Sequence, residues 1–508
     1  MIRRNINMIK SRRAIACVLA ATMILGVAGC EDAPAGGNAP VNNPDTIQTT
    51  TSATSAITSI DPDELAATDA EIKDVSSESF APDGNSGKIV WLGYYDLMTD
   101  GSASEQYKIF TSETYGGEIE YVSCSSGSAY FDKLGTMIAS DTSPDIVRYE
   151  WLSYPMGMGK NMYESVDGLI DIETPLWEEM SDVIEDFVYQ GKHYYLPYRI
   201  TPNFAINYNR KVVIDAGLTD PYDLYMENNW TWDTFRELMI QWCNLSDENI
   251  GYCGTGGMSF IATTGTPLID VKADGTINNN AQDANVTRAM EFLSGLYRDG
   301  LTYQKELGDW VSPELWATNS DRILFLGMGP EWTYSAASGT IQNPSGVEND
   351  ICGVPSDFAF VPFPRDPSSD TYSVAYDTFG YMIPKGAKNI KGAVDWIQLN
   401  RVYQTDEGLA ATAREDAINP TPVYYTAGKY EGQQKWALVW DERVYDVWQD
   451  MMDTSKFDFV FDDCYGFSSD LTTLADTLLN TPLFEGASWS QISAENAPLI
   501  ESIIDEYR

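Results

Sequence analysis

The chain of 508 residues is poor in histidine and in bases: it has one histidine, and its 32 Lys and Arg oppose 75 Asp and Glu, which gives a formal net charge of −43. The shortage of bases excludes nucleic acid as a partner, because phosphates are neutralised by clustered Lys and Arg. A single histidine leaves little room for histidine-based general-base catalysis or for a metal site with several histidines. No D-x-[DN]-x-[DN]-G run marks a calcium loop, so the sequence predicts no metal and no cofactor.

Cysteine is also scarce, and no CxxC motif is present. Five cysteines lie beyond the first thirty residues, an odd number that excludes a complete disulfide framework. Buried free thiols are the predicted state, while a bridge between Cys243 and Cys253 stays open as an alternative. The five are Cys124, Cys243, Cys253, Cys352 and Cys464.

Residues 1–29 differ from the rest of the chain, since they contain five bases and no acid. The apolar run at 14–29 is shorter than the ~20 residues that a membrane-spanning helix needs. A basic flank, a short apolar core and small residues before a cleavage site are typical of a secretory signal peptide. The run ends in VAGC at 27–30, which resembles the lipobox of bacterial lipoproteins. That resemblance implies that Cys30 carries a lipid and anchors the chain to the outer face of the cytoplasmic membrane. An ordinary signal peptide with a chance cysteine is the alternative.

Residues 30–87 consist mainly of Ser, Thr, Ala, Pro, Asp and Asn, with one aromatic residue, Phe80, and one base, Lys73. Such a segment cannot bury enough apolar surface to offset the entropy of ordering its chain. We therefore predict a disordered acidic tether between the lipidated cysteine and a folded body that begins at Lys88.

The start of the folded body alternates between two kinds of pattern. Apolar runs at 89–95, 118–122 and 145–147 predict strands, and the segments 102–115 and 129–140 between them predict helices. A β-α-β-α-β order indicates a parallel, doubly wound sheet, in which ligands collect at the carboxyl ends of the strands. The residues that this places at the rim of a cleft are Tyr94, Tyr95, Asp96, Tyr149, Glu150 and Trp151.

Three further helices are predicted later in the chain. Thr231 can cap one that carries Phe235 and Trp242, and an apolar stripe from 286 to 297 ends at a glycine. The four residues SWSQ at 488–491 form a potential capping box before a last helix.

Several stretches, taken in order, resemble the extracellular solute-binding proteins of family 1, the carbohydrate-binding lipoproteins of bacterial ABC importers. The matching stretches are GTMIASDTSPDIV at 135–147, GKHYYLP at 191–197, NYNR at 207–210, AGL at 216–218, DP at 220–221, WTWDTF at 230–235, GMGPEW at 327–332, VPFP at 361–364 and the helix at 386–399. The chain departs from the family pattern at Arg210, where many members have lysine, and in long insertions after Trp332 and between Gln404 and Trp489.

The resemblance implies an α/β, two-lobed periplasmic-binding-protein-like fold. Each lobe is then a mainly parallel sheet flanked by helices, with a ligand cleft between the lobes that closes by a hinge. Lobe one would comprise 88–198 and 366–405, and lobe two 199–365 and 406–508. Tyr198 would begin the first crossover, at the floor of the cleft.

A sugar is recognised by aromatic rings that stack on its C–H faces and by planar polar groups that bond its hydroxyls. The candidate ligand-binding residues are Tyr95, Asp96, Glu150, Trp151, Tyr198, Arg199, Glu331 and Trp332. Arg199 serves equally as a fork for hydroxyls or carboxylates or as half of a structural ion pair. Trp230 and Trp232 are interpreted as structural, and His193 as an exposed turn residue.

The sequence thus predicts a monomeric, lipid-anchored binding protein, without catalytic residues, that captures a carbohydrate and delivers it to ABC permease subunits in the membrane. Two alternatives are a lipid-anchored carbohydrate-active enzyme, such as a glycosidase or lyase, and a binding protein for a peptide or another small solute. The acidic composition favours an uncharged ligand held by aromatic residues over an anionic one.

Overall fold

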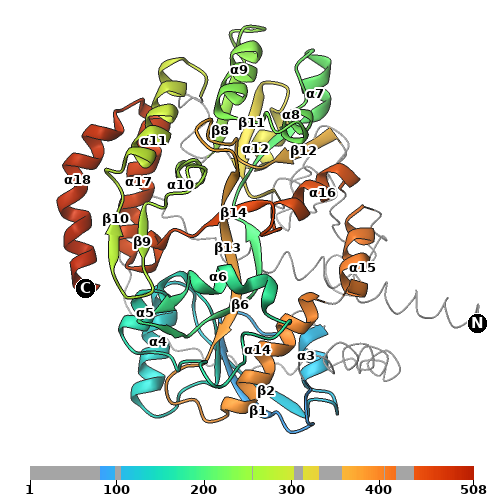
Figure 1. Ribbon diagram of the computed structural model, residues 1–508, viewed down its shortest axis with the longest axis vertical. Coiled ribbons are helices and arrows are strands. Elements are labelled where there is room, and N and C mark those ends of the chain that lie inside the picture. Colours follow the sequence, from blue (N-terminus) through green and yellow to red (C-terminus); the bar gives the residue numbers. More distant parts are fainter. Residues whose placement is uncertain are drawn as a thin grey trace, which may run out of the picture.

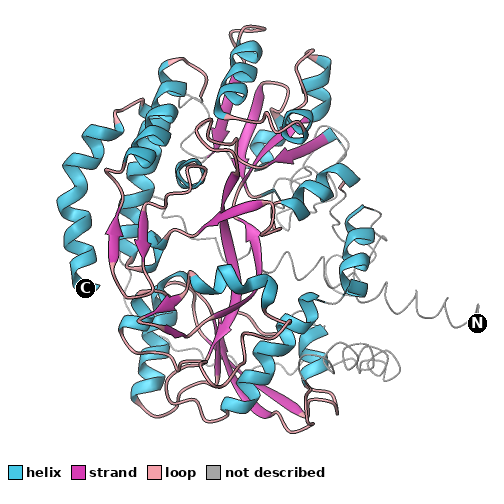
Figure 2. Cartoon of the chain, in the orientation of Figure 1, coloured by secondary structure: helices cyan, strands magenta, loops and turns pink. Residues whose placement is uncertain are grey.

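The computed structural model describes residues 81–97, 105–254, 256–302, 313–330, 357–405, 407–418 and 440–507. Two sheets, each flanked by helices, lie one above the other along the longest axis of the molecule (Figure 1). This two-lobed α/β architecture confirms the predicted fold class. Figure 2 shows that helices lie on the outside of both sheets.

The first sheet, in the lower half of Figure 1, has the strand order β14-β13-β3-β1-β2, with β6 also paired to β13. Its strands are β1 (Gly87–Gly93), β2 (Gly117–Ser123), β3 (Ile146–Arg148), β6 (Leu196–Pro202), β13 (Tyr372–Met382) and β14 (Phe457–Val460). β1 runs parallel to both β2 and β3, which confirms the predicted parallel β-α-β-α-β unit. β13 is antiparallel to β3 and β6 and parallel to β14.

Three helices accompany this sheet: α3 (Glu105–Phe110), α4 (Ser128–Ala139) and α14 (Ile390–Thr405). The prediction that the first of these extends to residue 115 is wrong, because α3 ends at Phe110. The hydroxyls of Thr111 and Ser112 donate to carbonyls of the preceding turn, at 3.0 and 2.6 Å, and so compete with continuation of the helix. Gly116 then turns the chain at a φ of 63°, where a Cβ atom would lie 2.1 Å from the carbonyl oxygen of Gly84.

The second sheet, in the upper half of Figure 1, has the order β12-β7-β11-β8. It consists of β7 (Ala205–Asn209), β8 (Ile250–Gly254), β11 (Ile323–Met328) and β12 (Phe358–Val361). β11 is parallel to β8, whereas β7 is antiparallel to both β11 and β12. Two of the three pairings among these described strands are therefore antiparallel, so the prediction of a mainly parallel sheet does not hold for this lobe. The helices in this half are α7 (Arg210–Asp215), α8 (Pro221–Met226), α9 (Trp232–Cys243), α10 (Gly257–Ala262), α11 (Ala284–Arg298), α12 (Pro313–Thr318), α16 (Glu442–Asp450), α17 (Ser469–Glu485) and α18 (Trp489–Ile504).

Shorter elements complete the described part of the chain. They are α5 (Met156–Gly159), α6 (Ser181–Glu185), α15 (Glu407–Ile418), the hairpins β4–β5 (Val188–Tyr189 and Lys192–His193) and β9–β10 (Ile269–Val271 and Ile277–Asn279), and the 3-10 turns η2 (Trp151–Ser153), η3 (Glu178–Met180), η5 (Asp463–Gly466) and η6 (Asp505–Tyr507). The lobe boundaries predicted above stay a prediction. β14 belongs by sequence to the segment that we expected in lobe two, yet it pairs with β13 of the first sheet.

The helix-capping predictions have two outcomes. Thr231 caps α9 as expected, since its hydroxyl accepts from the backbone N–H of Thr234 and the Thr234 hydroxyl accepts from the backbone N–H of Thr231, a complete capping box. The capping box at residues 488–491 is not formed, although α18 begins where predicted. The Ser488 hydroxyl instead donates to the carboxylate of Glu291 on the neighbouring helix α11, at 2.8 Å. A tertiary hydrogen bond therefore replaces the local one.

Most of the described tryptophans are part of the core. Trp91, Trp177, Trp230, Trp316, Trp396 and Trp489 are fully buried. Trp230 donates to the carbonyl of Pro362 at 2.8 Å, and Trp232 is 3% exposed, so both are structural, as predicted.

Candidate functional site

A cluster of aromatic and charged side chains lies at the carboxyl edge of the first sheet, where ligands collect in parallel α/β sheets. We call it the edge cluster. Its members come from the ends of β1 and β3 and from the neighbouring strands β6 and β13. They are Tyr94, Tyr95, Arg148, Glu150, Tyr198, Arg199, Phe379 and Tyr381.

Arg148, the last residue of β3, joins the edge cluster together. Its guanidinium donates to the hydroxyl of Tyr94 at 3.2 Å, and its Nε lies 3.8 Å from the Glu150 carboxylate. The same guanidinium lies 5.4 Å from the centre of the Phe379 ring. Burial raises the pKa of Glu150, and the positive charge of Arg148 opposes that shift. Arg148 is thus held in place by partners from two other strands.

Arg199 approaches the same ring from β6, where it lies opposite Phe379 in the β6–β13 register. Its guanidinium carbon is 4.4 Å from the ring centre, a cation–π contact. The preceding residue, Tyr198, stacks on Tyr381 with ring centres 5.7 Å apart and an angle of 23°. Arg401 of α14 donates to the Tyr198 carbonyl at 3.0 Å and fixes this part of β6.

The edge cluster has hydrogen-bonding capacity that the described residues do not use. Oε1 of Glu150 and Nε of Arg199 are both buried, and neither has a hydrogen-bond partner within the described parts of the chain. A buried polar atom without a partner costs about 1–3 kcal/mol, and a ligand or water that supplies the missing hydrogen bond removes that cost. The arrangement suits a ligand with several hydroxyl groups.

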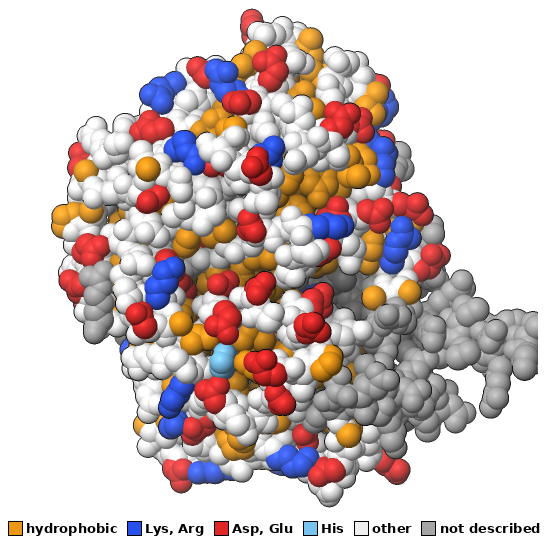
Figure 3. Space-filling model, in the orientation of Figure 1, with side chains coloured by type: hydrophobic (Ala, Val, Ile, Leu, Met, Phe, Trp, Pro, Cys, Tyr) orange, Lys and Arg blue, Asp and Glu red, His pale blue; other side chains and the backbone are white. Residues whose placement is uncertain are grey.

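Trp151 lies at the side of the edge cluster and is 50% exposed. Its ring centre is 5.3 Å from that of Tyr465 in η5, so the exposed ring is supported from a distant part of the sequence. Figure 3 shows hydrophobic side chains gathered across the middle of the visible face, with acidic side chains next to them. An exposed, supported indole is a suitable surface for the apolar face of a sugar.

The structure brings four of the predicted ligand residues together in the edge cluster: Tyr95, Glu150, Tyr198 and Arg199. The charge of Asp96 acts on Tyr107 of α3 and contributes to the raised pKa of that phenol, which is due first to burial. Glu331, Trp332 and the lipidation candidate Cys30 lie outside the described residues. Whether these residues contact a ligand stays a prediction.

We predicted Tyr149 at the rim of the cleft, but it lies in the core. It is 5% exposed and stacks on Tyr195 with ring centres 4.4 Å apart. Successive side chains of an extended segment point to opposite sides, so Tyr149 enters the core while Arg148 and Glu150 face the edge cluster.

Sequence reasoning missed Arg148, Phe379 and Tyr381. Arg148 directly follows the predicted third strand, so its position at a carboxyl end was a usable signal. Phe379 and Tyr381 gave no such signal, because they reach the cluster only through the pairing of β13 with β6 and β3.

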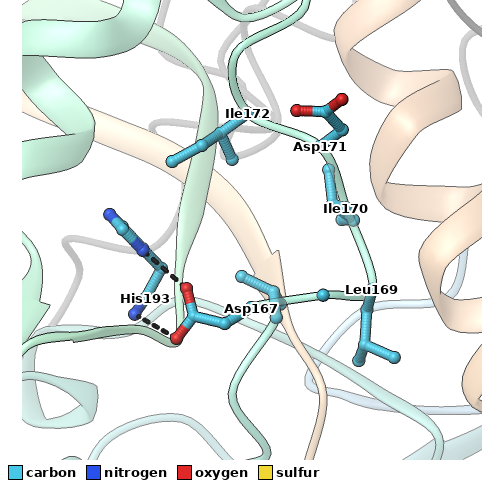
Figure 4. Close-up of a pocket in the computed structure, with 8 residues that line it drawn as sticks. Asp167, Leu169, Ile170, Asp171, Ile172 and His193 are labelled. Atoms are coloured by element: carbon cyan, nitrogen blue, oxygen red, sulfur yellow. Dashed lines mark hydrogen bonds and ion pairs between the residues drawn. The ribbon is translucent and has the colours of Figure 1, made fainter.

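His193 is not the exposed turn residue that we predicted. It belongs to β5, its side chain is 18% exposed, and its Nδ1 lies 2.7 Å from the carboxylate of Asp167 (Figure 4). The two residues lie on the wall of an open pocket of about 420 Å³ formed mainly by the loop 166–172. The hairpin β4–β5 brings His193 against that loop, a contact that local sequence does not indicate.

In the described parts of the chain, the cysteines form no disulfide and the acids form no metal-binding group. Cys124, Cys243, Cys253 and Cys464 are free thiols, so the alternative of a Cys243–Cys253 bridge is excluded, and Cys352 lies outside the described residues. Within the ranges listed above, no group of three or more His, Cys, Asp or Glu could hold a metal ion. No helix in those ranges combines the length and the apolar character needed to cross a membrane.

Known structures share this fold. The chain is similar to an ABC substrate-binding protein from Listeria monocytogenes in complex with cycloalternan, with 13% identity, a TM-score of 0.52, and 82% of this chain and 99% of that chain covered. It is similar to the galacto-N-biose-/lacto-N-biose I-binding protein of the ABC transporter from Bifidobacterium longum, in complex with lacto-N-biose. The identity is 11%, the TM-score is 0.55, and the match covers 83% of this chain and 97% of that chain. It is also similar to an ABC transporter associated binding protein from B. animalis subsp. lactis in complex with β-1,6-galactobiose. The identity is 17%, the TM-score is 0.52, and the match covers 83% of this chain and 98% of that chain.

No curated protein matches the sequence. The family model described as "bacterial extracellular solute-binding protein" matches residues 95–399, which is more than half of the chain and includes most of the edge cluster. The chain therefore belongs to the bacterial extracellular solute-binding protein family.

Proposed function

We propose that this protein captures a sugar or oligosaccharide between its two lobes and delivers it to the permease of an ABC transporter. The observation that carries the proposal is the edge cluster. It combines stacked aromatic rings with a carboxyl group and guanidinium groups that have unused hydrogen-bonding capacity. Sugars present apolar faces and rings of hydroxyls, and this combination matches both. The similar structures from Listeria and the two bifidobacteria, which are complexes with cycloalternan, β-1,6-galactobiose and lacto-N-biose, support the same ligand class.

Binding to a closing two-lobed protein can be measured as stabilisation of the folded state. We expect the purified full-length chain to unfold at a higher temperature with at least one member of a panel of mono- and oligosaccharides. A ligand at a hundred times its Kd contributes about 2.7 kcal/mol to folding stability. Calorimetric titration of the responding sugar then gives its Kd.

The same experiment separates the alternative functions. We propose a binding protein rather than an enzyme, so chromatography after long incubation should recover the responding sugar unchanged; cleaved products would favour a carbohydrate-active enzyme. Stabilisation by peptides with no response to any sugar would contradict the proposed ligand class and favour a peptide-binding protein.

We further propose that the mature chain is a monomer tethered to the outer face of the cytoplasmic membrane through a lipid on Cys30, with residues 30–87 as the tether. Expression of the complete chain in a bacterium should place it in the membrane fraction, and Cys30→Ser should release it as soluble protein or leave its leader uncut. Cys17→Ser, in the leader itself, is the matched control and should stay membrane-bound. A Cys30→Ser variant that is cleaved and still membrane-bound would refute the lipid anchor.

A further inference from the structure

Arg199 is exceptional among the arginines of the described residues. Each of the other ten donates a hydrogen bond to the protein or pairs with a carboxylate. Within the same parts of the chain, Arg199 does neither, and its Nε is buried. In a chain with 75 acids, a cation without an acidic partner is unexpected. The presence of such a cation in the edge cluster therefore suggests that its partner is a ligand.

The Phe379 ring holds the Arg199 guanidinium in one orientation. The guanidinium carbon is 4.4 Å from the ring centre, and the two residues are cross-strand neighbours on β6 and β13. A stacked guanidinium keeps the N–H groups at its edge free for other partners. Planar, pre-oriented N–H groups of this kind are the preferred partners of carboxylate and phosphate oxygens, often in pairs of parallel hydrogen bonds.

A second cation lies on the same ring. The Arg148 guanidinium carbon is 5.4 Å from the Phe379 centre, so two guanidinium groups converge there. The Nε of Arg148 lies 3.8 Å from the Glu150 carboxylate. The other nearby acid, Asp377, is bonded by the side-chain amide of Asn203 at 2.8 Å. Burial raises the pKa of both carboxyl groups, and the positive charge of Arg148 opposes that shift in each.

The acidity of the chain as a whole does not decide the sign of the charge that this place attracts. Salt screens exposed charges beyond about 8–10 Å at physiological ionic strength, so the groups in direct contact dominate. At the Phe379 ring those groups are the two guanidiniums and, beside Arg148, the Glu150 carboxyl group. The expectation of an uncharged ligand rests on net composition, which does not decide the sign of the charge attracted at this position.

We infer that Arg199 forms an oxyanion subsite and that the natural ligand is an acidic sugar, one that carries a carboxylate, sulfate or phosphate group. This inference rests on the proposed function and specifies its ligand class. The anionic group lies against the edge of the Arg199 guanidinium, and the sugar ring occupies the aromatic part of the edge cluster.

The test compares matched sugars that differ only in the anionic group. Calorimetric titrations of the full-length chain would use hexuronic acids against the corresponding neutral hexoses, as mono- and disaccharides, together with sulfated and phosphorylated hexoses. We expect one acidic class to bind at least tenfold more tightly than its neutral counterpart, and which class does so identifies the anion. Arg199→Gln should abolish that preference, while Arg199→Lys should keep part of it because the charge remains. Arg236→Gln, at an exposed arginine paired with Asp299 at 2.6 Å, is the matched control and should keep all of it.

The outcomes are distinguishable. Equal or tighter binding of the neutral sugars by the wild-type chain overturns the acidic ligand but leaves the proposed function intact. A preference that persists in a folded Arg199→Gln variant overturns the role of Arg199. Failure of every sugar, neutral or acidic, contradicts the proposed function and this inference together. If Arg199→Gln does not fold, the wild-type preference and Arg199→Lys still decide.

Discussion

Replacing Asp220 with alanine is expected to lower the free energy of unfolding by about 3–5 kcal/mol, because it removes one of the two carboxylates that pair with the buried Arg210 guanidinium, the acceptor of the Tyr208 hydroxyl and the cap of α8. Asp220 and Arg210 are 7% and 5% exposed, and the Arg210 Nε donates to the Asp220 carboxylate at 3.0 Å. The same carboxylate accepts the Tyr208 hydroxyl and caps α8 by accepting from the Tyr222 N–H at 3.0 Å. One side chain thus joins β7, α7 and α8.

The network continues into a distant part of the sequence. Arg210 also pairs with Asp441, whose carboxylate caps α16 by accepting from the Val444 N–H at 2.9 Å. Loss of Asp220 therefore weakens the attachment of α16 as well as the local helices. Chemical denaturation followed by tryptophan fluorescence would measure the change, with an unaltered dependence on denaturant concentration as evidence that the transition stays cooperative.

The matched control is Asp215→Ala in the neighbouring helix α7. Asp215 pairs with Lys211 on the surface, where both side chains are more than 60% exposed. Exposed pairs contribute little, since water and salt screen them, so this variant should leave stability unchanged. A similar small effect for Asp220→Ala would show that the buried network is not a determinant of stability.

The second large effect is expected in ligand binding rather than folding. Trp151→Ala should weaken sugar binding by about 30-fold, which corresponds to about 2 kcal/mol, the loss typical of an aromatic residue that contributes strongly to binding. Because Trp151 is 50% exposed and contacts mainly Tyr465, its removal should leave the melting temperature of the unliganded protein nearly unchanged. Calorimetric titration with the best sugar of the panel measures the affinity.

A control must separate loss of an aromatic surface from loss of any exposed apolar side chain. Leu245→Ala serves here, because Leu245 is 57% exposed and follows α9 in the other half of the molecule. Its affinity should equal that of the wild-type chain, and Trp151→Phe should retain most of the binding. Unchanged affinity in Trp151→Ala, or a large drop in its melting temperature, would contradict a ligand-stacking role.

The sequence predicted best those features that depend on neighbours along the chain. The parallel unit of β1, β2 and β3 follows from strand-length apolar runs separated by helical segments, and the cap at Thr231 needs only residues three apart. The predictions were less accurate where a residue distant in the sequence competes with a local partner for the same side chain. The Ser488 hydroxyl bonds Glu291 rather than its own helix, and His193 is covered by the loop that contains Asp167.

The candidate site shows the same division. Tyr95 and Glu150 were predicted because each lies at or just beyond the end of a predicted strand, and that position is readable from the order of elements. Tyr198 and Arg199, which lie within β6, were predicted from the family resemblance, which implies the first crossover there. Phe379 was not, since it is 180 positions from Arg199 and meets it only when β13 pairs antiparallel with β6.

By itself, then, the sequence determined the scarcity of histidine and bases, the exclusion of nucleic acid, the two-lobed α/β class and the family. These depend on composition, on periodicity and on the order of motifs. Only the tertiary structure decided which cations have partners. Charge composition is a sum over the whole chain, whereas an ion pair requires two groups within about 4 Å. Folding supplied acids or carbonyls to Arg148, Arg210 and Arg401 and, within the described residues, left the guanidinium of Arg199 stacked on Phe379 without either.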